Sequence, residues 1–299
     1  MTCFSSLVKR NLRLFFKDKG LLLTSLITPL ILLVLFVTFL GNVYRDSLIL
    51  MLPEGYAVPN DILSALVSGQ LVSSLLAVSC VTVSFCSNFL MVQDKALGIR
   101  ADLDISPVSN AILSLSYYVS AFLSSLIVCL TATLAGLAYM AAGGWYLSAS
   151  DVLCLFADVF LTVMFGTALS SVISHFLNSQ GQISAVGTIV SSGYGFLSGA
   201  YMPISSFSEG MQTVLSFLPG TYATGLFRNH ALRGASEQLR GVGLSDEAIR
   251  AMRDGMDCHL YFFDRPVSTS VMYLILIAAI ALLVGIYVIL CRMHKRRAR

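Results

Sequence analysis

Charged side chains are scarce in this chain. Asp, Glu, Lys and Arg make up 12% of its 299 residues, while hydrophobic residues make up 56%. Typical soluble domains carry about 25% charged residues. The mean hydropathy of +0.80 therefore indicates an integral membrane protein, with room for one small soluble excursion. We expect a single membrane domain over residues 1–299.

The chain also lacks the motifs of common enzymes. It has no G-x-x-x-x-G-K-S/T phosphate-binding loop, no G-x-S-x-G and no H-E-x-x-H. Its histidines are scattered over both predicted sides of the membrane, so we expect no catalytic constellation among them: His175, His230, His259 and His294. The sequence therefore predicts a protein that is not an enzyme and that binds no metal and no cofactor of its own.

Disulfide and zinc patterns are missing as well. Six of the seven cysteines lie in apolar runs or near the termini, and Cys258 alone lies in a large polar loop without an obvious partner. No C-x-x-C occurs, and no Cys and His residues have the spacing of a zinc site. We interpret these cysteines as small apolar filling residues.

Basic residues are concentrated at the two ends of the chain. Such clusters next to membrane spans favour retention in the cytoplasm and contact with anionic lipids. We therefore expect a multi-pass protein of the cell (plasma or inner) membrane with both termini in the cytoplasm, and nucleic-acid binding is the weaker alternative. Ten of the 19 Lys and Arg residues are terminal: Lys9, Arg10, Arg13, Lys17, Lys19, Arg292, Lys295, Arg296, Arg297 and Arg299.

The chain contains many long apolar runs. About 20 residues suffice to cross a bilayer as a helix. Ahead of the first run, residues 5–19 alternate apolar and basic side chains, which predicts an amphipathic helix at the membrane surface; an ordinary basic flank is the alternative. We expect an all-α integral membrane protein with six transmembrane helices, at about 21–40, 62–92, 108–140, 151–174, 183–201 and 267–290.

Two polar segments are expected outside the membrane. Residues 41–61 form a short external loop, and residues 202–266 form a larger one. Within the larger loop, Gly210–Phe227 is free of charge, but Pro219-Gly220 divides it into two short halves. This division favours an external re-entrant helix pair over a further span, because irregular backbone at membrane depth must pack against protein or water.

The end of the larger loop is the most polar part of the chain. Residues 228–265 carry six basic and six acidic residues, so we expect them to be soluble. Ser245 is a typical N-cap, and Ile249, Met252 and Met256 share one face of the helix that would follow. This pattern predicts a small amphipathic helix that packs on the outer surface.

A short charged island separates two long apolar runs. It spans Met91–Leu113, and we interpret residues 93–107 as a cytoplasmic coupling helix through which another protein moves the membrane part. Pro107 is placed as a first-turn residue of the next span. The alternative is a solvated loop that merely links two spans. The expected coupling residues are Asp94, Lys95, Leu97, Gly98, Arg100, Asp102 and Leu103.

One acidic residue lies inside a predicted span. Asp158 is seven residues beyond Asp151, at the start of the fourth run. A charged group at mid-bilayer costs about 2.5–3.5 kcal/mol. Asp158 should therefore face the helix bundle or a wet cavity, as a pathway or gating residue; the alternative is a carboxylate that reaches the headgroup layer.

Three stretches together resemble a known family. The island reads D-K-x-x-G-x-x-x-x-L-x-x-S-P-V-S from Asp94 to Ser109. Ser198-Gly-Ala-Tyr-Met-Pro203 is followed by Phe217-Leu-Pro-Gly-Thr-Tyr222 and then by Arg228. With the order of spans, these stretches resemble the permease subunit of bacterial ABC-2-type exporters, over nearly the whole chain. The family's island more often opens with Glu than with Asp, and the segment 229–265 is the part with least resemblance.

The resemblance implies a division of labour. Two permease chains, as a homodimer or a paralogous heterodimer, would form the pathway among membrane lipids, and separate cytoplasmic ATPase subunits would bind ATP and Mg²⁺. It implies export of an amphipathic or lipid-like substrate, such as a drug, peptide, lipid or glycolipid. The alternative is an ion-coupled secondary transporter or a channel without an ATPase partner. Expected pathway residues, besides Asp158, are Phe85, Asn88, Tyr194, Phe196 and Tyr201.

Overall fold

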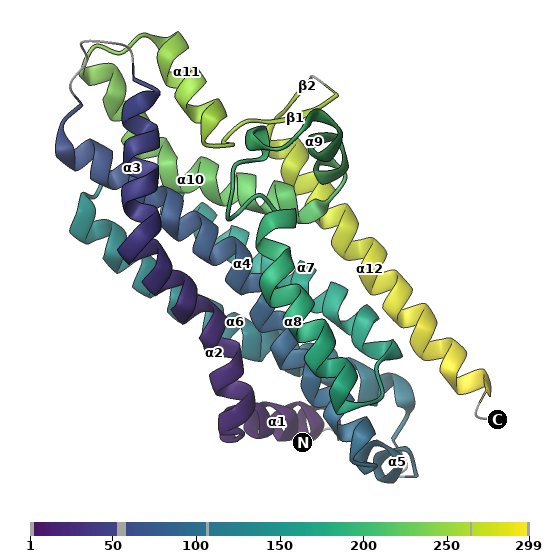
Figure 1. Ribbon diagram of the computed structural model, residues 1–299. Helices are drawn as coiled ribbons and strands as arrows, with labels where there is room; N and C mark the ends of the chain where they lie inside the picture. The colour runs from purple at the N-terminus through teal and green to yellow at the C-terminus, as the bar shows by residue number, and fades with distance from the viewer. Residues whose placement is uncertain (1–2, 53–57, 106–107, 264, 298–299) are drawn as a thin grey trace.

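The computed structural model of the chain describes residues 3–52, 58–105, 108–263 and 265–297. Nearly all of these residues lie in helices or in short connections between them (Figure 1). The expected all-α integral membrane fold is confirmed. Pro107, expected at the start of the third span, lies outside the described residues.

Five helical stretches of the described chain are long and apolar enough to cross a membrane. The fifth predicted span, 183–201, is not one of them. It forms α8, Gln180–Leu197, in which two glutamines and four glycines lower the hydropathy. The count of six spans therefore stays a prediction. The five stretches are Lys19–Leu50, α4 (Asn60–Ala96), α6 (Asn110–Gly143), α7 (Ala149–Phe176) and α12 (Thr269–Arg297), of which Thr269–Met293 forms the span.

The first span is longer than the sequence predicts. Helix α2, Lys19–Leu35, passes through a π-helical turn, Phe36–Leu40 (η1), into α3, Gly41–Leu50. The prediction of a loop over 41–61 is therefore wrong for its first half. Leu48 is buried and α3 packs on α4, so tertiary contacts extend the helix into a polar sequence.

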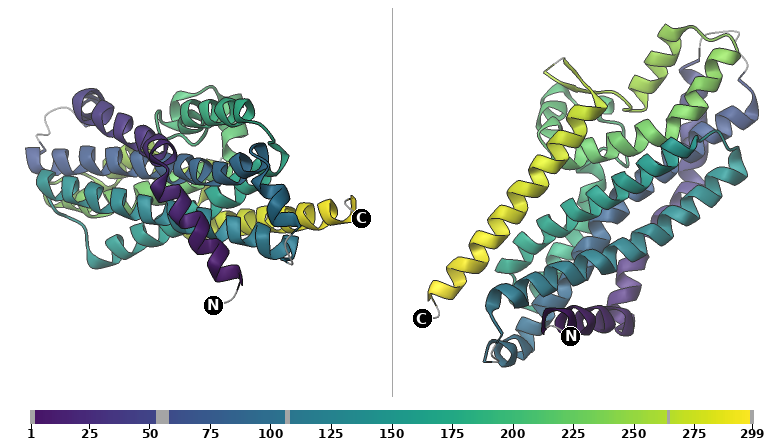
Figure 2. Two further views of the ribbon diagram at one scale, coloured as in Figure 1. Left: turned by 90° about the horizontal axis from the view of Figure 1, so that it is seen from below. Right: turned by 180° about the vertical axis from the view of Figure 1, so that it is seen from behind.

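Helix α1, Cys3–Lys17, lies across one end of the bundle (Figure 2). It buries one stripe of side chains at helical spacing, Leu7, Val8, Asn11 and Phe15, and leaves most of its basic residues exposed. The Asp18 carboxylate then accepts hydrogen bonds from the backbone N–H groups of Gly20 and Leu21 and so caps α2.

Helix α4 is the central element of the bundle. It is buried along almost its whole length and packs against α2, α6, α7, α8 and α10. Small residues let the neighbouring helices come close. At Gly166 in α7, an added Cβ would lie 3.0 Å from the Cα of Val81 and 3.1 Å from the carbonyl oxygen of Cys80. Close backbone contact of this kind is typical of helix packing in membranes.

The end of the bundle opposite α1 is built by short elements (Figure 1). The residues expected to form a re-entrant pair form α9, Glu209–Ser216, and α10, Pro219–Gly241, with Pro219 at the first helical position, and their depth in the membrane stays a prediction. After them come α11, Asp246–Gly255, and an antiparallel hairpin of β1, Leu260–Phe262, and β2, Arg265–Val267. A 3-10 turn, η2 (Ile204–Ser206), precedes α9.

Helix α10 corrects one expectation about this end. The sequence suggests that residues 228–265 are soluble, yet α10 continues to Gly241 and is buried from Gly220 to Leu232. It packs against α4, α7 and α12, so Arg228, Asn229 and His230 lie inside the protein, while the charged residues after them are exposed. The amphipathic helix after Ser245 is confirmed, because Ser245 caps α11 and Ile249, Met252 and Met256 are buried.

Candidate functional site

The coupling segment begins where α4 ends. Gly98 adopts a φ of +78°, which favours glycine, and stops the helix. Helix α5, Ile99–Asp104, follows directly, so the segment contains one short helix at the same end of the bundle as α1 (Figure 1).

Asp94 is the centre of a buried cluster at this end. It is 3% exposed. The Tyr117 hydroxyl of α6 donates a hydrogen bond to Asp94 Oδ2 at 2.5 Å, and Arg10 Nη1 of α1 donates at 2.8 Å. Sequence reasoning expected Asp94 on a docking surface, but the structure places it inside, because α1 and α6 cover it. The cluster joins α1, α4 and α6.

The charge of Arg10 is maintained by this pairing. Burial would lower the pKa of the Arg10 guanidinium, but the hydrogen bond and charge of Asp94 outweigh burial, so the pKa is raised. Charge-assisted hydrogen bonds of this kind are stronger than bonds between neutral groups. Arg10 therefore stays positively charged beside Asp94.

Lys95 connects the same segment to α7. Its Nζ donates hydrogen bonds to the backbone carbonyl oxygens of Ser174, His175 and Leu177, at 3.1, 2.9 and 3.3 Å. A cation at a helix C-terminus is favoured by the helix dipole and by the unpaired carbonyls. Like Asp94, Lys95 therefore faces neighbouring helices, where sequence reasoning expected a docking residue.

The remaining coupling residues divide into two groups. Arg100 lies with its guanidinium carbon 5.8 Å from the centre of the Tyr117 ring, and Leu103 packs on a small cluster with Leu7 and Met91. Leu97, Gly98 and Asp102 are exposed, Leu97 by 69%. With Ile105, which is also exposed, the outer surface of the segment presents two large apolar side chains and the Asp102 carboxylate.

Two of the expected pathway residues are buried on α4. Phe85 is 2% and Asn88 1% exposed. The Asn88 amide donates to the Thr167 carbonyl and to the hydroxyls of Ser170 and Ser171. Asn88 therefore joins α4 to α7, and Phe85 belongs to the hydrophobic core of the bundle.

The other aromatic candidates lie around the end of α8. Phe196 is 51% exposed and meets the Tyr201 ring edge-to-face at 5.1 Å. Tyr194 lines an apolar cavity of about 290 Å³, where Pro219 and Gly220 of α10 meet Leu282 and Leu283 of α12.

A groove between α2, α4 and α8 was not expected from the sequence. Its volume is about 470 Å³. It is lined by both apolar side chains and hydroxyl groups, a composition that suits an amphipathic molecule. The hydroxyl groups at helical spacing were the available sequence signal. The groove is lined by Asp18, Gly20, Leu21, Thr24, Ile27, Thr28, Cys86, Phe89, Gln93, Ile183, Ser184, Gly187, Thr188 and Ser191.

Asp158 forms a second buried cluster, in the half of the bundle farther from α1. It is fully buried. His230 Nδ1 of α10 lies 2.6 Å from Asp158 Oδ2, and the Tyr273 hydroxyl of α12 donates to Asp158 Oδ1 at 2.6 Å. Asp158 therefore faces the inside of the bundle. Sequence reasoning missed His230 because it placed that residue in a soluble segment.

A buried ion pair lies between α10 and the segment after α11. Arg228 Nη1 donates to Asp257 Oδ2 at 2.8 Å, and Arg228 Nη2 donates to the Gly199 carbonyl at 2.6 Å. Burial raises the pKa of Asp257, and the charge of Arg228 opposes this rise. The neighbouring Cys258 thiol is fully buried, and burial raises its pKa to about 11. Through Arg228, this ion pair holds the segment that follows α8 against α10.

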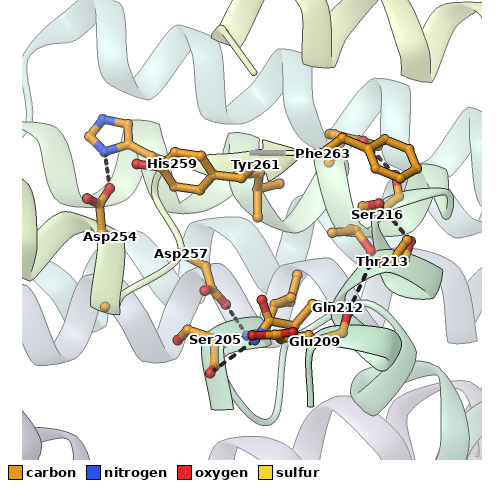
Figure 3. A pocket seen from close by; sticks show the side chains of 15 residues that line it. Ser205, Glu209, Gln212, Thr213, Ser216, Asp254, Asp257, His259, Tyr261 and Phe263 are labelled. Carbon is orange, nitrogen blue, oxygen red and sulfur yellow. Dashed lines mark hydrogen bonds and ion pairs between the residues drawn. The ribbon is translucent and has the colours of Figure 1, made fainter. Parts of the chain in front are cut away.

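A pocket of about 690 Å³ opens beside this ion pair (Figure 3). Its polar groups largely satisfy one another. Ile204 N–H donates to Asp257, and His259 Nδ1 lies 2.7 Å from Asp254 Oδ1. The Gln212 amide donates to the carbonyls of Ser205 and Phe207.

Comparison with known proteins adds one match. A family model described as ABC-2 type transporter matches residues 2–231. The matched interval begins at α1, contains the coupling segment, Asp94 and Asp158, and ends within α10 one residue after His230. No curated protein matches the chain.

Proposed function

This chain belongs to the ABC-2 type transporter family, as a membrane permease, and we propose that it works in an ATP-driven exporter whose energy comes from separate cytoplasmic ATPase subunits. Those subunits would bind ATP and Mg²⁺, since the sequence of this chain has no phosphate-binding loop. The α1 end of the bundle would face the cytoplasm with both termini, in agreement with the basic residues there.

The connection of the coupling segment to three helices carries this proposal. Asp94 binds α1 and α6 through Arg10 and Tyr117, and Lys95 binds the C-terminal carbonyls of α7. Both residues lie in the last turns of α4, the central helix. A push on α5 or α1 would therefore move α4 and, through it, the helices that pack against it.

The surface for the ATPase would be the exposed side of the coupling segment. Leu97 is 69% and Ile105 84% exposed, and Asp102 lies between them in sequence. Large apolar side chains exposed beside a charge are typical of a protein contact. The exposed basic residues of α1 would provide a second contact.

The groove between α2, α4 and α8 would receive the substrate. Its mixture of hydroxyl groups and apolar side chains favours an amphipathic or lipid-like molecule. Large apolar residues of the adjacent helices are exposed, among them Leu23, Ile31 and Ile189. A second permease copy, identical or paralogous, would face this side and complete the pathway.

Charge and polarity changes on the exposed segment test the proposal. Leu97→Asp combined with Asp102→Lys should leave folding intact, because both side chains are exposed. We expect loss of at least about tenfold in the ATP hydrolysis stimulated by the co-purified ATPase, since a few anchors carry most of an interface. Asp246→Lys, at an exposed site at the opposite end, is the matched control.

Two results would count against the proposal. One is an ATPase stimulation by the double variant that equals that of the wild type. The other is the purification of the wild-type chain, active in transport, with no ATPase subunit bound.

A further inference from the structure

The Asp158 cluster ties three separate elements together inside the bundle. Asp158 lies on α7, His230 on α10 and Tyr273 near the start of α12. The His230 ring also stacks on the Tyr273 ring, with centroids 6.2 Å apart. Among the described residues, the two hydrogen-bond partners of Asp158 are thus one titratable imidazole and one neutral hydroxyl.

The net charge of this cluster depends on a single proton. When the carboxylate and the imidazole hold one proton between them, the cluster is neutral, as an ion pair or as two neutral groups. Without that proton, Asp158 carries a full negative charge that neither His230 nor Tyr273 cancels. An uncompensated buried charge costs several kcal/mol more than a paired one.

The surrounding groups do not replace that proton. Two thiols, those of Cys80 on α4 and Cys154 on α7, lie close enough to Asp158 to interact electrostatically with it. The other charges of α7 and α10 in this region are paired: Asp151 with Arg233 at 3.3 Å, and Arg228 with Asp257 at 2.8 Å. The sequence of α6 contains no Asp, Glu, Lys, Arg or His at all.

We propose that Asp158, His230 and Tyr273 form a proton-binding latch, which holds α10 against α7 and α12 while one proton is shared between carboxylate and imidazole. Loss of the proton leaves a net negative charge in the interface, and α10 then separates from α7 so that water reaches Asp158. Rebinding of a proton restores the neutral cluster and closes the interface.

The proton would enter and leave through His230. Its side chain is 9% exposed, whereas that of Asp158 is 0% exposed. On opening, the cluster releases one H⁺ to water and retains the Asp158 carboxylate with a neutral imidazole; on closing, it takes one H⁺ back. No other group is consumed or formed.

Thermal unfolding at several pH values tests the latch. The full chain in lipid nanodiscs should lose about 5 °C of its unfolding midpoint between about pH 6 and about pH 9, because the closed interface requires the proton. In Asp158→Asn the amide is neutral at every pH and still accepts a hydrogen bond from Tyr273. We expect this pH-dependent loss to disappear in Asp158→Asn.

A second variant gives an independent result. His230→Gln leaves the carboxylate as the cluster's titratable acid, and a carboxyl group ordinarily releases its proton at lower pH than an imidazole does. We therefore expect the drop in the midpoint to move to lower pH by at least about one unit. This variant also tests the latch if Asp158→Asn fails to fold.

The chain contains a matched control. His259 and Asp254 form the same type of pair at 2.7 Å, but their side chains are 37% and 39% exposed. His259→Gln should keep the wild-type profile. The latch is refuted if the pH-dependent loss persists unchanged in Asp158→Asn, if His230→Gln keeps the wild-type profile, or if His259→Gln abolishes the loss.

Discussion

Two buried aspartates, Asp94 and Asp158, are held in nearly the same way in different parts of the bundle. Each carboxylate accepts a hydrogen bond from a tyrosine hydroxyl, at 2.5 Å from Tyr117 and at 2.6 Å from Tyr273. Each also lies beside a basic side chain from a third helix. The difference is the base: Arg10 for Asp94 and His230 for Asp158.

Because of this difference, the Arg10–Asp94 pair is a fixed connection between helices, whereas the His230–Asp158 pair is a titratable one. Arginine keeps its charge at every pH that a protein experiences, so the cation beside Asp94 is always present. Histidine changes its charge near neutral pH. The end of the bundle that we assign to ATPase contact is therefore held rigidly, while the other half contains the pair that we infer to respond to protons.

Removal of the Asp94 carboxylate should have the largest effect. In Asp94→Ala, Arg10 loses its ion partner and the Tyr117 hydroxyl its acceptor. We expect a loss of about 2–3 kcal/mol in unfolding free energy, which is less than a fully buried pair would give because Arg10 is 30% exposed. Denaturant unfolding in detergent measures this. Asp102→Ala, at an exposed site of the same segment, should change stability by less than about 0.5 kcal/mol.

Replacement of Arg10 should make the connection at Asp94 depend on pH. Arg10→Gln leaves Asp94 buried without a cation, so the carboxylate is neutral only when protonated. Stability should then be retained at low pH and lost as pH rises, by about 1–2 kcal/mol at neutral pH, whereas the wild-type cluster gives no such slope. Unfolding between about pH 4 and about pH 8 measures this. Two results would contradict this prediction. One is an unfolding free energy of Arg10→Gln that does not change with pH. The other is an equal dependence on pH in Lys9→Gln, where the replaced side chain is exposed.

The two tyrosines should contribute similar amounts. Tyr117→Phe and Tyr273→Phe each remove one hydroxyl that donates to a buried carboxylate. We expect each to cost about 1.5–2 kcal/mol, at the lower end of the range for hydrogen bonds to charged groups. Unfolding free energies of the two variants, measured side by side at one pH, test this equality. A cost for one variant several times that of the other would show that the clusters are built differently.

An exposed pair should show the smallest effect. Arg240 and Asp246 lie 2.9 Å apart, but their side chains are 67% and 70% exposed. Arg240→Ala should change the unfolding free energy by less than about 0.5 kcal/mol, because water already solvates both charges. A larger loss of unfolding free energy would mean that ion pairing without burial is enough to explain how much the Asp94 and Asp158 clusters stabilise the protein.

Hydropathy predicted much of the architecture. Apolar runs of membrane length mark α4, α6, α7 and α12, because a helix must satisfy its own backbone in lipid. Ser245 and the face of Ile249 and Met252 predicted α11, because capping and helical spacing are local properties. The cost of an intramembrane carboxylate indicated that Asp158 must turn inward.

Local sequence failed where packing overrides polarity. Residues 41–50 and 228–241 are polar enough to suggest loops, yet both are helical because they pack on α4. Asp94 and Lys95 lie in a charged island that suggested a docking surface, but α1, α6 and α7 surround them. The sequence alone carries no information on which distant helix covers a given charge.

The sequence by itself determined that the chain is a membrane protein, that it lacks a phosphate-binding loop and that one acid lies within a span. These properties follow from residue type and order along one helix at a time. Only the tertiary structure decided that Arg10 meets Asp94 and that His230 meets Asp158, across 84 and 72 positions of chain. Such pairs form because a buried charge must find its partner in whichever helix packs against it.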